Sequence, residues 1–185
     1  MLYSMAYNIK DVFYLDVSML TGTSTGDGTA QLDLSSYIDP IARRGSKAQG
    51  LAIYKIHTSI TEGNASVAGM DLDGSMRIGL IAGLGAGDTA VGSGGFAAGG
   101  MSASNDLLVY GADYYQDTGV QYDNFREFLV PSKDVPYIVV RDNVCMGLNV
   151  DDAFATSLTV SMRLECAITP LDQSTLNQLL RTQTV

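Results

Sequence analysis

The side chains that most often carry out chemistry are scarce in this chain. It contains one histidine, His57, two cysteines, Cys145 and Cys166, and no tryptophan. Acid–base and nucleophilic catalysis usually depend on histidine or cysteine placed beside a second reactive group. His57 has no second histidine at His-x-His spacing, and one imidazole cannot form a metal cage. We therefore predict no catalytic, cofactor-binding or metal-binding residues, and a protein that is not an enzyme.

Two pairs of carboxylates are candidates for an acid and a base. Asp151 and Asp152 are adjacent, and Asp113 and Asp117 are four residues apart. Glycoside hydrolysis needs two carboxyl groups that face each other across the substrate. Nothing in the sequence places a facing acid opposite either pair, and we expect solvated loop residues. A hydrolase that uses these carboxylates is one of the alternatives for the function.

The segment Asp71-Leu72-Asp73-Gly74 resembles half of a calcium-binding loop. An EF-hand needs a bidentate Glu at the twelfth position, which Ala82 occupies here. An ordinary Asp-Gly turn is the preferred interpretation. A weak calcium site shared between subunits stays open.

The segment from Gly83 to Gly100 contains eight glycines. Gly83-Leu84-Gly85-Ala86-Gly87 follows a predicted strand, but a dinucleotide fingerprint needs glycine where Asp88 stands and a helix afterwards. Small residues allow another backbone to approach closely. We predict a long loop that packs against another chain and binds no cofactor.

Four of the ten tyrosines, Tyr110, Tyr114, Tyr115 and Tyr122, lie close together in the sequence. Tyrosine buries an apolar ring while its hydroxyl stays hydrated, and it is common at interfaces. The cluster predicts either a surface between subunits or a ligand-binding loop.

The charge of the chain argues against nucleic acid as a partner. The formal net charge is −9, and 17 of the 20 acidic residues are Asp. No Lys or Arg occurs between Arg77 and Arg126, whereas a phosphate-binding surface needs clustered cations. Lys10 and Asp11 interrupt the apolar N-terminal residues, so we expect no signal peptide.

Short runs with a period of two dominate the chain, which is typical of half-buried β-strands. In the last run, Leu158, Val160, Met162 and Leu164 alternate with polar residues and predict one buried stripe. A helix is expected at about 170–181, with Thr169 as N-cap and Asp172 completing a capping box. The eight runs span Phe13–Met19, Gln31–Ile38, Gly50–Thr61, Ser75–Ala82, Asp106–Ala112, Phe125–Val130, Tyr137–Cys145 and Thr156–Ile168.

Eight short strands with regular turn residues predict an all-β sandwich or barrel. The antiparallel eight-stranded solution with two Greek keys is the jelly roll. We expect residues 1–185 to form a single jelly-roll domain that includes the short C-terminal helix.

These features resemble the small single jelly-roll major capsid proteins of tailless icosahedral viruses that contain a membrane, the sphaerolipovirus-like viruses. The similarity lies in the size, the eight runs, the acidic loops and the ending, where Leu158 to Glu165 leads to Thr169-Pro170-Leu171-Asp172.

The resemblance implies a structural protein of the virion that is made in the host cytoplasm. It implies self-association into homo-oligomeric capsomers of an icosahedral shell, which a second capsid or spike protein joins in some viruses, next to an internal membrane and without direct contact with nucleic acid. The main alternative is a carbohydrate- or receptor-binding jelly-roll module, supported by the tyrosine cluster.

Overall fold

The computed structural model describes residues 11–39, 47–62, 66–67, 73–83, 101–117 and 122–183, with backbone only at positions 62, 66, 67, 122 and 123. This part of the chain contains ten strands and one helix. The strands are β1 (Val12–Leu20), β2 (Gly26–Asp33), β3 (Ala48–Glu62), β4 (Ser66–Val67), β5 (Gly74–Ala82), β6 (Leu108–Asp117), β7 (Tyr122–Leu129), β8 (Tyr137–Val139), β9 (Asn143–Asp152) and β10 (Leu158–Leu171), and the helix is α1 (Gln173–Thr182).

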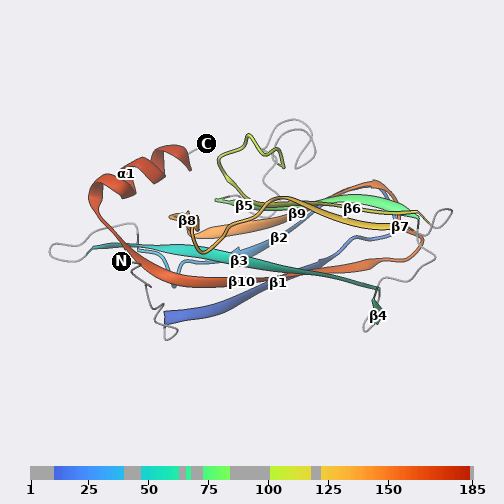
Figure 1. The fold of residues 1–185 in the computed structure, drawn as a ribbon, viewed down its shortest axis with the longest axis horizontal. Coiled ribbons are helices and arrows are strands. Elements are labelled where there is room, and N and C mark those ends of the chain that lie inside the picture. Colours follow the sequence, from blue (N-terminus) through green and yellow to red (C-terminus); the bar gives the residue numbers. More distant parts are fainter. Residues whose placement is uncertain are drawn as a thin grey trace, which may run out of the picture.

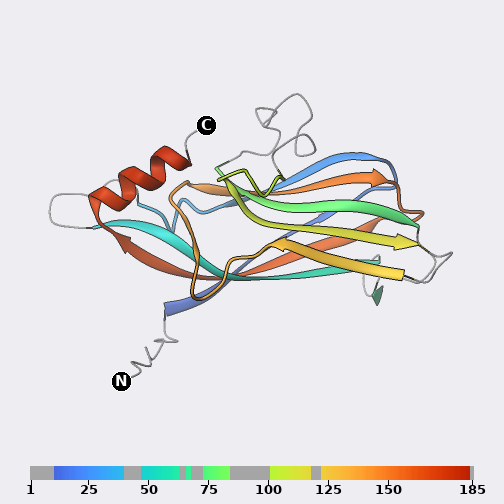
Figure 2. The same cartoon turned by 45° about the horizontal axis from the view of Figure 1, so that its top comes forward.

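The strands form two sheets that lie face to face, as Figure 1 shows nearly edge-on. Sheet A has the order β1-β10-β3-β4, and β8 also pairs with β3. Sheet B has the order β2-β9-β5-β6-β7, which is visible as a row of strands in Figure 2. Every pairing in both sheets is antiparallel.

The pairings are nested along the chain. The first strand pairs with the last, β1 with β10, and further inward β2 pairs with β9, β3 with β8, and β5 with β6. This is the pattern of one long antiparallel hairpin wound into two sheets, which defines a jelly roll. The predicted all-β jelly roll with a C-terminal helix is therefore confirmed, and β4 and β7 are additions to its eight strands.

The core lies between the sheets and follows from the alternation of side chains along each strand. In β10, Leu158, Val160 and Leu164 are 0% exposed and Met162 is 1% exposed. The predicted buried stripe is confirmed. From sheet B, the core receives Met76, Ile78, Leu80, Tyr110, Val144, Met146 and Leu148.

A β-bulge changes which side chains of β3 face the core. The register shifts so that Cys166 pairs with Ile53 and Glu165 pairs with Lys55, which leaves Tyr54 as the extra residue. Ile53 and Ile56 both point into the core although they are three residues apart. Uninterrupted alternation along the predicted run Gly50–Thr61 would place Tyr54 on the same face as Ile56, and this expectation is wrong because of the bulge.

Three strand boundaries differ from the sequence-based prediction. β2 begins at Gly26 and ends at Asp33, so residues 34–38 form a turn instead of the second half of a strand. The run Tyr137–Cys145 is two strands, β8 in sheet A and β9 in sheet B. The polar stretch 113–124, between the predicted runs Asp106–Ala112 and Phe125–Val130, has the composition of a loop but is mostly strand, because β6 continues to Asp117 and β7 begins at Tyr122. In the third case, tertiary pairing formed strands where local composition favoured a loop.

Helix α1 begins three residues later than expected. Asp172 is the N-cap, and its Oδ1 accepts a hydrogen bond of 2.7 Å from the N–H of Thr175. Thr169 and Pro170 belong to the end of β10 instead. Pro170 is tolerated there because β1 reaches only to Ala167, so this part of β10 has one neighbour, β3.

The helix packs at one end of the sandwich, visible at the left of Figures 1 and 2. Leu176 is 1% exposed and lies in a small apolar cluster with Ala48, Val140 and Leu171. Gln183, just after the helix, connects α1 to β8 and the residue that follows β8. Its side chain accepts from Val140 N–H at 3.1 Å and donates to Ile138 C=O at 2.6 Å.

Candidate functional site

The outer face of sheet A brings together polar residues from β1, β10 and β3. The register aligns Asp16, Arg163 and His57 in one row across the three strands. The next row consists of the three serines Ser18, Ser161 and Ser59. Between these rows, Val17, Met162 and Thr58 point inward, because neighbouring residues in a strand face opposite sides.

Ion pairs fix the side chains of the first row. The Arg163 guanidinium donates from Nε to Asp16 Oδ1 at 2.7 Å and from Nη2 to Oδ2 at 3.4 Å. His57 Nε2 lies 2.9 Å from Glu165 Oε1. The Arg163 guanidinium also lies 6.0 Å from the centre of the Tyr14 ring. The charges of Asp16 and Arg163 offset each other, and the Glu165 carboxylate lies beside His57.

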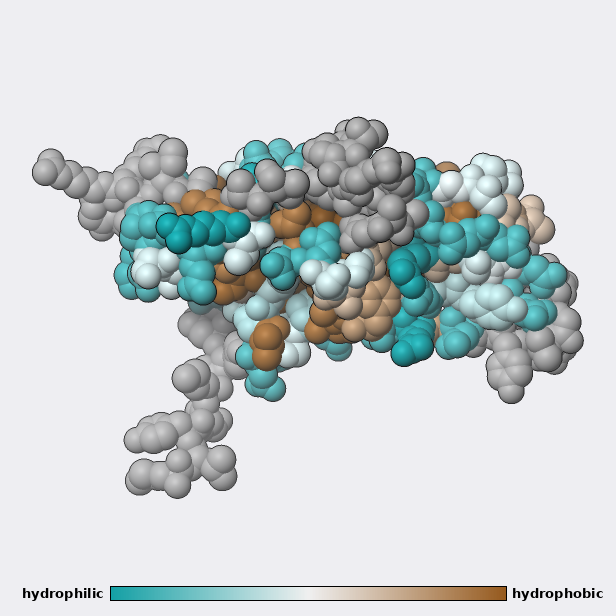
Figure 3. All heavy atoms as spheres, turned by 90° about the horizontal axis from the view of Figure 1, so that it is seen from above, coloured by the Kyte–Doolittle hydropathy of each residue, from teal (hydrophilic) through white to brown (hydrophobic). Residues whose placement is uncertain are grey.

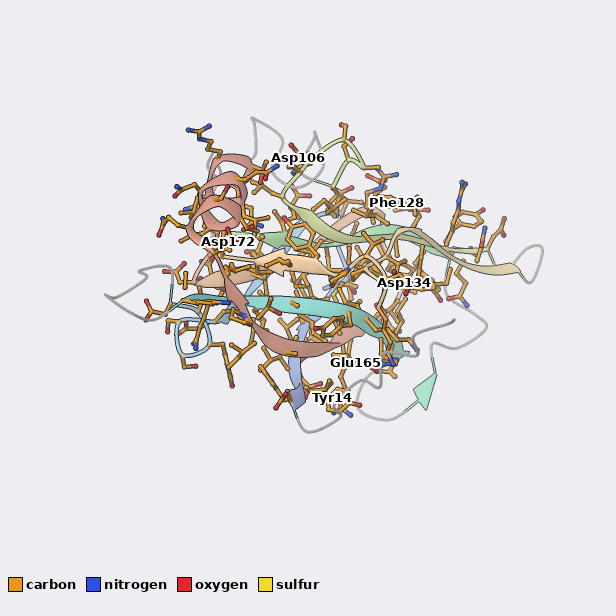
Figure 4. All side chains as sticks on the ribbon, turned by 60° about the vertical axis from the view of Figure 1, so that its left-hand side comes forward. Tyr14, Asp106, Phe128, Asp134, Glu165 and Asp172 are labelled. Carbon is orange, nitrogen blue, oxygen red and sulfur yellow. The ribbon has the colours of Figure 1, made fainter. Side chains whose placement is uncertain are left out.

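The two rows line an open hollow of about 420 Å³. Its lining comprises Asp16, Val17, Ser18, His57, Thr58, Ser59, Ser161, Met162 and Arg163. The serine side chains are shorter than those of the charged row beside them, which explains the depression in the sheet surface. Figure 4 shows Tyr14 and Glu165 on the same side of sheet A, in the row beyond the charged one.

Sequence reasoning missed this hollow. It placed His57 alone on a strand, whereas the structure brings His57 beside Glu165, 108 residues away in the sequence. The alternation of each strand does show that Ser59 and Ser161 point outward. Only the strand register places them next to each other.

The outer face of sheet B has a corresponding row of glycines. Gly147, Gly79 and Gly111 align across β9, β5 and β6. A Cβ at Gly79 would lie 2.7 Å from Cγ of Met101, and one at Gly111 would overlap the ring of Phe128. The glycines therefore make room for side chains of the chain itself. Figure 3 shows apolar side chains reaching the surface among polar ones on this side of the molecule.

A second small core lies over this glycine row. It consists of Ile81, Met101, Leu107, Leu108 and Cys145 and includes contacts with Phe128 and Leu129. The Arg77 guanidinium lies 5.4 Å from the centre of the Phe128 ring. Phe128 projects from the outer surface of sheet B in Figure 4. The bulge between Gly111 and Ala112 turns Phe128 toward this face.

The tyrosine cluster predicted from the sequence is divided between the core and the surface. Tyr110 is 0% exposed and Tyr114 is 4% exposed. The Tyr110 hydroxyl accepts a hydrogen bond from Thr58 and donates one to Glu127 Oε1, both at 2.9 Å, which links the two sheets through the core. Burial raises the pKa of Tyr110 well above its ordinary value.

The prediction of a shared tyrosine surface is therefore wrong for Tyr110 and Tyr114. Both lie in β6, where period-two alternation points them into the sandwich. Tyr115, between Tyr114 and Gln116, points outward and is 48% exposed. The side chain of Tyr122 lies outside the described residues.

The candidate acidic pairs do not face each other as an acid and a base. Asp113 binds Arg77, with 2.7 Å between Oδ1 and Nε, and this bond raises the pKa of the guanidinium. Asp117 accepts a hydrogen bond from the Tyr115 hydroxyl at 3.0 Å. Asp151 and Asp152 are exposed at the end of β9. Asp73 is exposed too, and Asp71 lies outside the described residues.

The remaining points concern metal binding, the two cysteines, the glycine-rich segment and membrane-spanning helices. The described residues contain no group of three or more His, Cys, Asp or Glu that could hold a metal ion. Cys145 and Cys166 are buried free thiols, and burial raises the pKa of Cys166 to about 12. Of the glycine-rich segment 83–100, all but Gly83 lies outside the described residues. No helix of the described chain is long and apolar enough to cross a membrane.

Exposed apolar side chains gather at two opposite margins of the sandwich. One margin is formed by β1 and β2, the first strands of their sheets, where Tyr14 is 57% and Leu20 is 61% exposed. The other margin is formed by β7 and the loop after it, where Phe125, Val130 and Val135 are 39%, 44% and 73% exposed. β2 and β7 are four strand spacings apart, about 19 Å.

Comparisons with known proteins add little to this geometry. No protein family model matches the sequence, and no curated protein matches it. Among solved structures, the chain is similar to VP1 of Trichodysplasia spinulosa-associated polyomavirus, with a TM-score of 0.34 and 8% identity over 87% of this chain and 97% of that chain. At this TM-score and identity the likeness carries no argument about the role of this chain. The narrower resemblance to sphaerolipovirus-like proteins stays a prediction.

Proposed function

We propose that this protein is a structural subunit of a viral capsid, and that copies pack side by side through the two margins. In this proposal residues 1–185 act as one jelly-roll domain within homo-oligomeric capsomers of an icosahedral shell. The observation that carries the proposal is the pair of different apolar margins on opposite sides of the sandwich.

Two different patches favour contacts that join the front of one copy to the back of the next. Such heterologous contacts produce a closed ring where the rotation between neighbours closes. A capsomer is a ring of this kind. A lone exposed apolar residue needs no explanation, whereas two at the β1/β2 margin and three at the β7 margin favour a contact surface.

Charge also distinguishes the two margins. The β1/β2 margin carries Asp11, Asp16, Asp27 and Asp33, with Arg163 beside Asp16. At the β7 margin, Arg126 and Lys133 lie in the same stretch as Glu127 and Asp134, so the charges nearly balance. Two β1/β2 margins would repel each other, whereas a β1/β2 margin can approach a β7 margin. Electrostatics therefore favours the heterologous contact.

The finer features of the proposal follow the resemblance to membrane-containing viruses. The protein would reside in the virion, with other copies of itself as its main partner. A second capsid or spike protein and an apposed internal membrane are further partners of this proposal. The net charge of −9 supports a shell that does not bind the genome directly.

The margins can be tested by light scattering and negative-stain imaging of the purified chain. We expect the parent protein to form oligomers or sheets, and Leu20→Glu and Val135→Glu to remain single subunits. Ile168→Glu is the matched control, since Ile168 is 43% exposed on β10 but belongs to neither margin. All three positions are exposed, so the variants should melt with the parent.

Two results would contradict the proposal. A parent protein that remains a single small species at every concentration and salt level would exclude self-assembly. Equal assembly of Leu20→Glu, Val135→Glu and the control would exclude the margins as the contact surface.

A further inference from the structure

We propose that the hollow on the outer face of sheet A binds a neutral carbohydrate. The hollow is the one formed by the charged row Asp16, Arg163 and His57 and the serine row Ser18, Ser161 and Ser59. Its volume of about 420 Å³ is within the range of pockets that take small ligands, roughly 300–1,000 Å³. The inference does not rest on the proposed capsid role, but the site shares Asp16 and Tyr14 with the β1/β2 margin.

The serine row provides hydroxyls that can bind a ligand. No hydrogen bond within the described residues uses the side-chain hydroxyl of Ser18, Ser59 or Ser161, although each is near solvent. Each hydroxyl can donate one hydrogen bond and accept others. Three of them in line across adjacent strands, about 4.8 Å apart, match a ligand that presents several hydroxyls of its own.

The charged row adds the ion-paired carboxylate of Asp16 and guanidinium of Arg163, both exposed to solvent. A guanidinium has five N–H donors, and in the described structure Asp16 is the hydrogen-bond acceptor for two of them. The remaining donors and the lone pairs of Asp16 lie side by side at the rim. Adjacent hydroxyls of a sugar can donate to the carboxylate and accept from the guanidinium at once. Such charge-assisted hydrogen bonds are stronger than neutral ones.

The charge balance of the site favours a neutral ligand. Arg163 is paired with Asp16, and His57 is paired with Glu165. An anion attracted by Arg163 would meet both carboxylates and a chain of net charge −9. A cation attracted by the carboxylates would meet Arg163 and the nearby Lys55, which lies opposite Glu165 in the register. A polyhydroxylated neutral molecule avoids both repulsions.

An aromatic ring lies next to the hollow on the same face. Tyr14 is 57% exposed and belongs to the row beyond the charged one. The C–H face of a sugar is apolar and packs on such rings, while the Tyr hydroxyl remains in water. A saccharide longer than one unit would therefore extend from the serine row past Arg163 to Tyr14.

Saturation-transfer NMR with the full chain tests the proposal, because it reports on bound sugar whether or not the protein assembles. The probes are glucose, galactose, mannose and N-acetylglucosamine. We expect saturable transfer from at least one of them with a dissociation constant in the millimolar range. His57 is the chain's single histidine, so its ring resonances should shift with the same concentration dependence and locate the binding.

Ser161→Leu fills the hollow, and we expect it to reduce the transfer at least tenfold while the melting temperature stays unchanged. Ser174→Leu is the matched control on the exposed side of α1 and should bind as the parent does. Arg163→Lys keeps the charge but loses the two-pronged bond to Asp16, and it should weaken binding severalfold.

Three results would overturn the proposal. One is the absence of saturable transfer from every probe up to about 100 mM, a hundredfold above the millimolar affinity expected. Another is equal binding by Ser161→Leu and Ser174→Leu. The third is a shift of the His57 resonances by sodium sulfate without any response to the sugars, which would indicate an anion site. The margin variants test assembly separately, and the sugar titration is repeated with Leu20→Glu, which is expected to remain a single subunit and so leaves Asp16 and Tyr14 accessible.

Discussion

Replacing Val160 with Asp tests the register of the whole jelly roll. Val160 is 0% exposed in β10, between Met19 of β1 and Ile60 of β3. The substitution removes roughly 1.5–3 kcal/mol of apolar burial. It also places a carboxyl group in the core, where no cation is available among the described core residues.

The second cost can be estimated from protonation. A buried carboxyl avoids its charge by keeping its proton. Since pH 7 is about three units above the ordinary carboxyl pKa of about 3.9, protonation at that pH costs about 4 kcal/mol. Together the two terms give at least about 5 kcal/mol, comparable with the whole stability of many domains. For a chain of 185 residues this lowers the melting temperature by about 10–20 °C.

Thermal unfolding followed by circular dichroism measures this difference. Ser161→Asp is the matched control, because Ser161 follows Val160 but points to the outer face, and it should stay within about 1 kcal/mol of the parent. In Val160→Asp, the pKa of the introduced carboxyl is raised in the folded state. Its penalty is therefore absent below the unfolded pKa and grows as the pH rises toward the folded pKa.

The reasoning fails if Val160→Asp melts within two or three degrees of the parent. It also fails if Ser161→Asp costs as much, because the two faces of β10 would then be equivalent. A deficit that does not shrink between pH 7 and pH 4 would show that the introduced carboxyl is solvated and not buried.

Three further predictions concern the helix and assembly. Gln183→Ala leaves Val140 N–H and Ile138 C=O without their partner, so it should cost about 1–3 kcal/mol and speed hydrogen exchange at Val140, unlike the exposed Gln178→Ala. The hydrogen bond from the Thr175 N–H lowers the pKa of Asp172 in the folded state. The ionised carboxylate therefore stabilises α1 above the unfolded pKa of Asp172, and this stabilisation is lost as the pH falls through the folded pKa. After correction for the intrinsic pH dependence of exchange, the protection of α1 amides should therefore fall at acid pH in the parent but not in Asp172→Asn, which keeps a cap without titrating. Copies of net charge −9 repel one another, so assembly measured by light scattering should strengthen with calcium or with added salt, as the Debye length falls from about 30 Å at 0.01 M to about 3 Å at 1 M. Dissociation at high salt with no effect of calcium would contradict this account of assembly.

The elements with regular alternation could be predicted from the sequence. β10 is the clearest example, because its stripe of Leu158, Val160, Met162 and Leu164 continues without interruption. The errors occur where a non-local contact changes the pattern. The bulge at Tyr54 shifts the faces of β3, and the break after Val139 moves the chain from sheet A to sheet B. Neither event has a local sequence signal as strong as a Gly-Pro or Asn-Gly turn.

The helix shows how competing signals are resolved. Thr169-Pro170 is a typical helix start, yet the backbone there stays paired with β3 through Leu171. The strand pairing satisfies backbone groups that an earlier helix would leave open. Asp172 then caps the helix at the first position free of the sheet. The prediction of Thr169 as N-cap is wrong, because the sheet extends past it and leaves Asp172, expected only as the capping-box partner, to cap the helix.

The candidate site could not be found from the sequence because it is made of rows across strands. Ser18, Ser59 and Ser161 belong to strands separated by tens of residues, and each serine alone is an ordinary outward-facing residue. The glycine row of Gly79, Gly111 and Gly147 was missed for the same reason. Both rows require the register of three strands to be known.

Comparison of the two rows supports a binding role for the hollow. A row of small residues across a sheet leaves space above it, and the chain fills that space on sheet B with Met101 and Phe128. On sheet A, the space above the serine row is an open hollow with polar groups at its rim. Glycine has no side chain that could form hydrogen bonds, so apolar side chains can cover the glycine row without leaving polar groups unpaired. Hydroxyls beside a fixed carboxylate–guanidinium pair suit a polar molecule instead, and this difference in lining is why we assign the sheet A hollow to a sugar.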